Sequence, residues 1–332
     1  MPAHHPTIPE GRLGVATADE YDAAGWSRSA RRHAVRRGRL VRVAAGRFAP
    51  PPSASLSTFQ QADLALARRA VAGTIQGDRV AAGLLAAAWM QGCPIWAQTP
   101  RTCVATWDPR VRQLAGLHLH HMADGASVVR RLDVPMTSMA TTLVGIACEF
   151  GTESALVSGD FALRHGLVNL RALTATIDAF RGHTGIDRAR LLPALLDPLA
   201  ESPLESRGRW HIRKHGLTVP YSQVLIHALD GRFLGRVDHY WADGVVGEAD
   251  GLLKYDDDPK ALALEKGRQQ GLEDVDIEVA RWGSRDFLDF TAASGRITRA
   301  HVRRRQRVAA GETPRWIATT LAGVRIPVTG RG

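Results

Sequence analysis

An arginine-rich stretch without acidic residues is the feature that most restricts what this chain can form. Between Ala23 and Ala62 the sequence holds no Asp or Glu. The same interval holds eight arginines: Arg28, Arg31, Arg32, Arg36, Arg37, Arg39, Arg42 and Arg47. The whole chain is basic as well, with 43 Lys and Arg against 33 Asp and Glu and a net charge of +10. Such an excess attracts polyanions, so nucleic acid, an anionic membrane surface and an acidic protein are the candidate partners.

Local signals predict two short helices and a hairpin in this basic stretch. Thr17 and Glu20 have the spacing of a capping box. Ser27 is a typical N-cap, and Gly38 stands where a helix ends in the left-handed conformation. The expected elements are a strand or helix end at 15–16, a helix over 17–24, a turn at Gly25, a helix over 28–37, and strands over 40–43 and 48–49. Two helices followed by a two-stranded wing is the order of a winged helix-turn-helix domain.

The arginines of the second helix favour DNA as the partner. Arg28, Arg32, Arg36 and Arg39 follow one another at spacings of three and four, so they lie on one helical face and can meet a phosphate backbone together. The alternative is a solvated basic helix without a partner. The predicted DNA-contacting residues are Arg28, Arg31, Arg32, Arg36, Arg39, Arg42 and Arg47.

Residues Thr17–Ala49, with GWSRSARRHAVRRGRLVRVAAGRFAP at their centre, resemble the N-terminal winged-helix domain of AbiEi-type antitoxins. These are the antitoxin halves of type IV toxin–antitoxin pairs. The segment VPMTSMATTLVGIA (Val134–Ala147) resembles part of that family's second domain, although the arginine usual near Thr141 and the aspartate usual near Gly145 are missing. The resemblance covers about residues 11–180. It implies operator binding and pairing with a cognate toxin, and it does not imply an enzyme.

Residues 55–200 read as a mainly helical middle domain with a strand-and-loop interval between Thr102 and Val134. Within that interval, His118 and His120 would share a strand face, as zinc ligands can. No cluster of Cys, Asp or Glu lies near them or His121 in sequence, which favours a structural or surface role. The three cysteines, Cys93, Cys103 and Cys148, contain no CxxC pair and read as core residues of a protein in the reducing cytoplasm.

A third region, residues 201–290, predicts the order α-β-β-β-α-β. Ser202, Pro203 and Glu205 are the cap, N1 and N3 residues of its first helix, which runs to about His215. The expected strands are Tyr221–Leu229, Phe233–Tyr240, Val245–Asp250 and, last, Ile277–Trp282, with a helix over Leu262–Gln270. The basic tail over 291–332 shows no clear pattern. The N-terminus lacks an apolar signal region, and the apolar stretch Val80–Met90 is too short to span a bilayer.

Carboxylates are placed on two of these strands. Glu248 and Asp250 share a face because side chains alternate along a strand, and a neighbouring strand can bring Asp238 beside them. Three carboxylates repel one another unless a cation lies between them, and Mg²⁺ or Mn²⁺ accepts such oxygen ligands. Lys254 and Lys266 could steady the charge of a phosphate. Glu205 is explained equally well as a helix-capping residue.

The segments ESPLESR, GRVDHYW and VVGEADGLLKY resemble the PD-(D/E)XK nuclease superfamily, in particular its members related to very-short-patch-repair endonucleases. The resemblance covers about residues 201–290. It implies that Asp238 and Glu248 are metal ligands and that Glu205 is a supporting acid. Asp250 stands where the superfamily has its lysine, so that role would fall to Lys254 or be absent.

We therefore expect an α/β multidomain protein. Its parts would be a winged helix-turn-helix domain (11–50), a mainly helical middle domain (55–200), a restriction-endonuclease-like α/β domain with a mixed sheet (201–290) and a basic tail (291–332). The expected function is binding of double-stranded DNA with Mg²⁺-dependent phosphodiester hydrolysis, in phage defence or DNA processing. The alternative is a non-enzymatic antitoxin or transcriptional autorepressor with an inactive nuclease fold. An anionic-membrane or acidic-protein binder would explain the charge but not the wing.

Overall fold

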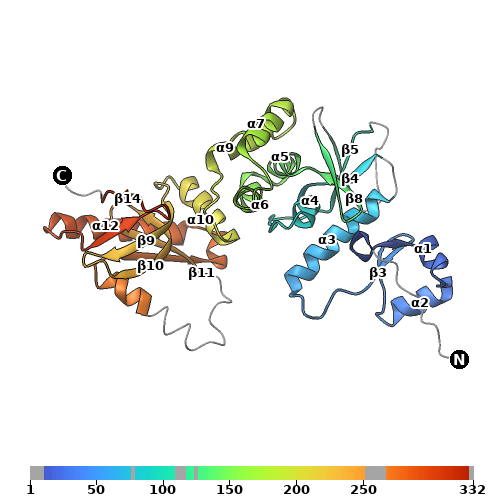
Figure 1. Cartoon of the computed structure of the whole chain (residues 1–332), viewed down its shortest axis with the longest axis horizontal. Coiled ribbons are helices and arrows are strands. Elements are labelled where there is room, and N and C mark those ends of the chain that lie inside the picture. Colours follow the sequence, from blue (N-terminus) through green and yellow to red (C-terminus); the bar gives the residue numbers. More distant parts are fainter. Residues whose placement is uncertain (1–10, 76–78, 109–116, 123–125, 251–266, 329–332) are drawn as a thin grey trace. The chain divides into compact units, whose positions relative to one another are not determined.

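The protein is an α/β protein, seen here in a computed structural model that describes residues 11–75, 79–108, 117–122, 126–250 and 267–328 (Figure 1). The chain forms two compact units, residues 1–196 and 197–332. The described residues contain three β-sheets of three, five and six strands. None of the helices in these residues has the length and apolar character that crossing a membrane requires.

The first unit begins with the two helices and the hairpin that the sequence predicts. The elements are a 3₁₀ helix (Arg12–Gly14), β1 (Ala16–Thr17), α1 (Ala18–Ala23), α2 (Arg28–Arg36), β2 (Val41–Ala44) and β3 (Arg47–Ala49), with the strands in the order β1-β3-β2. Thr17 and Glu20 form the expected capping box, and Ser27 Oγ accepts a hydrogen bond from Ala30 N at 3.1 Å. Gly38 has a φ of 68°, the left-handed conformation expected after α2. Tyr21, Trp26 and Leu40 are buried in the core of this segment.

The described remainder of the first unit combines helices with a five-stranded sheet, and three of its strands lie in the predicted strand-and-loop interval between Thr102 and Val134. The strands are β4 (Val80–Ala82), β5 (Cys103–Thr106), β6 (His118–His121), β7 (Val128–Arg131) and β8 (Val134–Thr137), in the order β6-β5-β4-β8-β7. The helices are α3 (Thr58–Thr74), α4 (Leu84–Met90), α5 (Met139–Phe150), α6 (Thr152–Arg164), α7 (Leu170–Ala179), α8 (Ile186–Arg190) and α9 (Leu192–Leu195). The central strand β4 lies in an alanine-rich segment whose local preference is helical. Pairing with β5 and β8 on both sides overrides that preference.

The second unit contains the predicted α-β-β-β-α-β order. Its elements are α10 (Pro203–Lys214), β9 (Tyr221–Ala228), β10 (Phe233–Trp241), β11 (Val245–Asp250), helical residues 267–273 and β12 (Glu278–Gly283). The predicted helix residues 262–266 lie outside the described residues. Strands β9, β10 and β11 are antiparallel in turn, and β12 is parallel to β11. The sheet is therefore mixed, as expected.

The chain after residue 290 is a folded part of this unit, which corrects the expectation of a patternless tail. A 3₁₀ helix (Ser284–Leu288) leads into α12 (Thr291–Ala309), β13 (Trp316–Thr319) and β14 (Arg325–Ile326). Strand β13 pairs with β9, so the full strand order is β12-β11-β10-β9-β13-β14. The buried face of α12 consists of Ala293, Ile297, Ala300 and Arg304. The guanidinium of Arg304 lies 4.8 Å from the centre of the Trp316 ring. Because a charged residue occupies one of the four buried positions, the helical spacing of apolar residues is hard to recognise in the sequence.

The sheet of the second unit also buries a histidine that has to stay uncharged. His239 on β10 is 0% exposed, and its ring stacks on Trp282 with the ring centres 5.2 Å apart. Burial, with a smaller effect of Arg209, lowers the pKa of His239 from 6.5 to about 3. The unfolded chain therefore binds a proton between these two pH values while the folded unit does not. Stability from this residue is complete above pH 6.5 and declines as the pH falls towards 3.

We expect His239→Phe to flatten the acid side of the stability profile. Between pH 8 and pH 5, protonation of the unfolded chain at His239 should remove about 2 kcal/mol from the wild-type free energy of unfolding, and the variant should not show this loss. Urea denaturation of both proteins at the two pH values measures the difference. Equal pH dependence in both proteins would contradict a neutral buried His239.

Candidate functional site

Asp238 and Glu248 lie on the same face of the second unit's sheet. Strands β10 and β11 are antiparallel with His239 opposite Gly247, and the same register continued by one residue places Asp238 opposite Glu248. Asp238 Oδ2 accepts a hydrogen bond from Ala249 N at 3.0 Å. The two carboxylates therefore share a sheet face, as strand alternation predicted. Asp250 is the last residue of β11. Lys254 and Lys266 lie outside the described residues. We call the surface formed by Glu205, Asp238 and Glu248 the acidic face.

Glu205 reaches this face from α10 and also serves the start of its helix. Its backbone N–H donates to the N-cap Ser202 Oγ at 3.2 Å, as expected. Its carboxylate Oε2 accepts hydrogen bonds from Glu201 N and from Gln223 Nε2 on β9, both at 2.9 Å. Burial raises the pKa of Glu205, and the neighbouring Asp238 raises it further. The capping and acidic-face interpretations of Glu205 are therefore compatible, since one side chain does both.

Arg268 places a positive charge beside Glu248 on the acidic face. It lies in the helical residues 267–273, and its Nη1 is 2.9 Å from Glu248 Oε1. The same Nη1 is 3.5 Å from the carbonyl oxygen of Arg236, so the guanidinium lies over both β10 and β11. Arg268 was not predicted, because an arginine in an expected surface helix reads as solvated. Its guanidinium provides a counter-charge for Glu248.

Both strand carboxylates of the acidic face have protein partners in this arrangement. Glu248 is held by Arg268, and Asp238 accepts from a backbone N–H. Among the described side chains, the group of three with ligand atoms close enough for one ion lies elsewhere, at His118, His120 and Glu149 of the first unit. Magnesium ligation by Asp238 and Glu248 would have to coexist with these contacts or displace them.

The predicted DNA-contacting arginines divide into exposed and buried members. Five are exposed: Arg28, Arg32, Arg36, Arg39 and Arg42. Arg47 on β3 is half-buried, and its Nη1 donates to the Ala45 carbonyl at 2.8 Å. Arg31 was wrongly included, because it is 5% exposed, pairs with Asp22 and donates to the Trp26 carbonyl at 2.7 Å. Arg31 lies three residues before Ala34, on the same buried side of α2.

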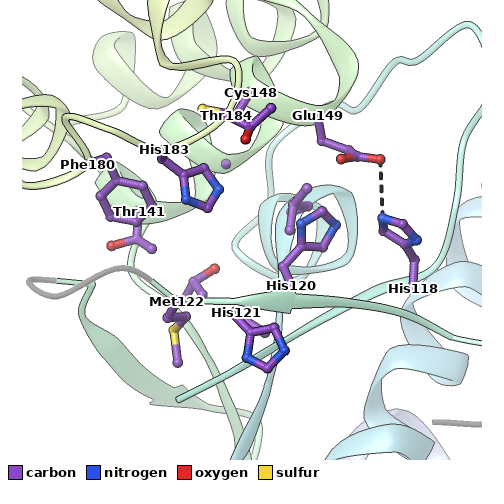
Figure 2. Close-up of a pocket in the computed structure, with 14 residues that line it drawn as sticks. His118, His120, His121, Met122, Thr141, Cys148, Glu149, Phe180, His183 and Thr184 are labelled. Carbon is purple, nitrogen blue, oxygen red and sulfur yellow. Dashed lines mark ion pairs between the residues drawn. The ribbon is translucent and has the colours of Figure 1, made fainter. Parts of the chain in front are cut away.

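A second group of polar side chains surrounds a cavity of about 250 Å³ in the first unit. His118 and His120 project from β6, and Glu149 comes from the last turn of α5 (Figure 2). His118 Nε2 is 3.4 Å from Glu149 Oε1, and the rings of the two histidines are 4.6 Å apart. No cluster of acidic residues lies near these histidines in sequence, because Glu149 comes from a distant part of the chain. The fold therefore adds a carboxylate to the two histidines, contrary to the expectation of a structural or surface role.

Burial keeps His120 uncharged near neutral pH. Desolvation lowers the pKa of His120 to about 4, against the opposing pull of Glu149. Its ring is therefore neutral near pH 7 and carries a lone pair. His120 Nε2 is buried and has no hydrogen-bond partner among the described residues. A neutral imidazole whose nitrogen has no partner can accept a hydrogen bond or coordinate a metal ion together with the neighbouring carboxylate.

We expect Arg268→Gln to destabilise the second unit much more than Arg236→Gln. Glu248 is 6% exposed, so removing the opposing guanidinium weakens the compensation of a buried charge and should cost about 3 kcal/mol. Arg236 pairs with Glu201 at 2.8 Å in a more exposed position, so its loss should cost less than about 1 kcal/mol. Denaturant-dependent hydrogen exchange of β10 and β11 measures both. Adding Glu248→Gln to Arg268→Gln should restore stability, and failure to do so would contradict the charge argument.

No model of a known protein family matches the chain. Two proteins of Mycobacterium tuberculosis are similar to it: the uncharacterized protein MT2308 of strain CDC 1551 / Oshkosh and the uncharacterized protein Rv2248 of strain ATCC 25618 / H37Rv. Each is 30% identical to this chain over 244 residues, which cover 73% of this chain and 84% of the relative. The similarity therefore extends over most of both proteins. The chain belongs to the same family as these two mycobacterial proteins.

Proposed function

We propose that this protein binds double-stranded DNA through residues 11–50. The observation that carries the proposal is the row of exposed arginines Arg28, Arg32 and Arg36 on α2. A spacing of four residues separates their attachment points by about 6 Å along the helix axis, so the three side chains can reach successive phosphates. The opposite side of α2 packs through Ala34 into the core, which holds the arginine row outward.

The surrounding elements support the same proposal. The order of α1, α2 and the β2–β3 hairpin is that of a winged helix-turn-helix, in which the second helix enters the major groove. Arg42 and Arg47 lie on the hairpin and would contact the flanking backbone. The resemblance of this region to AbiEi-type antitoxins agrees with operator DNA as the target.

We further propose a non-enzymatic role, as an antitoxin or transcriptional autorepressor acting in the cytoplasm with a cognate toxin as protein partner. The support is the acidic face of the second unit. Its carboxylates bond to Arg268, Ala249 N and Gln223, which gives each of them an internal partner without a metal ion. Asp250 in place of the superfamily's lysine agrees with a nuclease-like fold that has lost its chemistry.

Mg²⁺- or Mn²⁺-dependent phosphodiester hydrolysis is the second candidate function. The observation in its favour is that Asp238 and Glu248 share one sheet face, with Glu205 beside Asp238. These are the positions that resemble the nuclease ligands. For hydrolysis, the metal ion would have to bind Glu248 beside Arg268 or displace it.

Replacing Arg28, Arg32 and Arg36 together by alanine should weaken DNA binding and flatten its salt dependence. Each lost phosphate contact should reduce the slope of log affinity against log salt concentration by about 0.9, so the triple variant should lose about 2.7 in slope. Fluorescence anisotropy with labelled duplex DNA at several salt concentrations measures this slope.

The matched control is Arg69→Ala, Arg171→Ala and Arg181→Ala, which removes three exposed arginines of the first unit outside residues 11–50. Net charge falls by the same amount in both triple variants, so only the position of the charge differs. Equal slopes for the two variants would show that binding depends on net charge and not on the α2 surface.

Plasmid cleavage distinguishes the two candidate functions. We expect supercoiled plasmid to remain intact with the purified protein and Mg²⁺ or Mn²⁺, because Arg268 neutralises Glu248. Nicking of the plasmid by the wild type would favour hydrolysis over the regulatory role, provided that Asp238→Asn abolishes the nicking and leaves duplex binding unchanged. Glu201→Gln, on the exposed pair with Arg236, is the control substitution and should leave the result of the assay unchanged.

A further inference from the structure

We propose that His118, His120 and Glu149 form a binding site for a divalent transition metal ion of the zinc class. This site lies entirely in the first unit, and it is independent of the DNA-binding surface and of the acidic face in the second unit. Two imidazoles and one carboxylate provide three ligands, a set found in zinc enzymes whose fourth position is open.

The strand places the two histidines, and α5 completes the set. His118 and His120 alternate with Leu119 on β6, so both rings project to the same side. The parallel ladder with β5, in which Cys103 lies opposite His118 and Ala105 opposite His120, fixes the position of β6. Figure 2 shows Glu149 approaching His118 from the helix above the strand.

The distances suit one small ion. One ligand atom from each residue lies within 4.8 Å of the other two. His118 Nε2 and Glu149 Oε1 are 3.4 Å apart. Two ligands at about 2.1 Å from a tetrahedral zinc ion are separated by about 3.4 Å, so this pair already has the required spacing. Rotation of the His120 ring towards them is the adjustment that remains.

His120 gives an independent reason to place an ion here. Its Nε2 is buried and has no hydrogen-bond partner among the described residues. A buried polar nitrogen without a partner is unfavourable, and such groups are rare in native proteins. Coordination of a metal ion would give this nitrogen a partner.

The ligand chemistry selects the kind of ion. Imidazole nitrogen favours zinc and its neighbours among the transition metals, whereas Mg²⁺ and Ca²⁺ favour oxygen ligands. The cavity beside the group has room for water or a small anion at the open position. Thr141, His183 and Thr184 line it and offer hydrogen-bonding groups to such a molecule (Figure 2).

Arg101 is the cation that an incoming metal ion has to compete with. Its Nη1 is 3.4 Å from the same Glu149 oxygen that faces His118. Arg101 is itself 51% exposed in its side chain, so it can swing into solvent when Glu149 turns to a metal ion. Removing Arg101 should therefore strengthen metal binding or leave it unchanged, whereas removing a ligand should weaken it.

The test uses the full chain, stripped of metal with a chelator, and two probes. Isothermal titration with Zn²⁺ gives the affinity and stoichiometry, and visible absorption of added Co²⁺ reports the coordination geometry. The variants are His120→Gln and Glu149→Gln, with Arg101→Gln and His121→Gln as matched controls. His121 is the next residue on β6, and its side chain points away from Glu149 (Figure 2). Circular dichroism verifies that each variant is folded.

We expect the wild type and both control variants to bind one equivalent with a tetrahedral Co²⁺ spectrum. His120→Gln and Glu149→Gln should lose more than about 100-fold in Zn²⁺ affinity, because even the loss of an outer-shell partner commonly weakens metal sites by 10–100-fold. Wild-type affinity in folded Glu149→Gln, or a wild type that gives no tetrahedral Co²⁺ spectrum, would overturn the proposal. The outcome does not depend on DNA binding, so the two proposals can fail separately.

Discussion

The packing of Trp282 against two glycines determines how the second unit is assembled. Its indole is buried where a Cβ on Gly208 of α10 would lie 2.6 Å from Nε1, and where a Cβ on Gly247 of β11 would lie 2.6 Å from the ring. Helix and sheet can approach this closely because both positions lack a side chain. The first turn of the same helix carries Glu205 to Gln223 on β9. The geometry of the acidic face thus depends on an apolar contact one helical turn away.

Local signals in the sequence predicted those parts of the structure that local interactions determine. The Thr17–Glu20 capping box, the turn at Gly38 and the strand alternation that pairs Asp238 with Glu248 all depend on residues close in sequence or on one hairpin. What the sequence did not reveal comes from distant contacts. Glu149 meets His118 across a helix–sheet contact, and Arg268 meets Glu248 after a crossover. No spacing rule links such pairs, so only the folded chain brings them together.

The arginines of the two units are used differently, and this qualifies the meaning of the net charge. In α12, Arg303 and Arg307 form ion pairs with Glu278 and Asp276 at 2.8 and 2.9 Å. These ion pairs link α12 to the region of β12 and partly neutralise the two arginines. The arginine row of α2 lies in a segment of sequence without acidic residues. Exposed positive charge without acidic neighbours in sequence therefore lies on α2, although basic residues occur along the whole chain.

The pairing of β13 with β9 has a consequence for the synthesis of the protein. Strands β9, β10 and β11 emerge from the ribosome first and can form a meander, but β9 keeps an unpaired edge until Trp316–Thr319 has been translated. Unpaired edges are the usual starting points of intermolecular β-pairing. The nascent chain therefore exposes the unpaired edge of β9 during most of the synthesis of the second unit. A premature stop after α12 would leave it exposed permanently, which makes the last strands a safeguard against aggregation as well as a part of the fold.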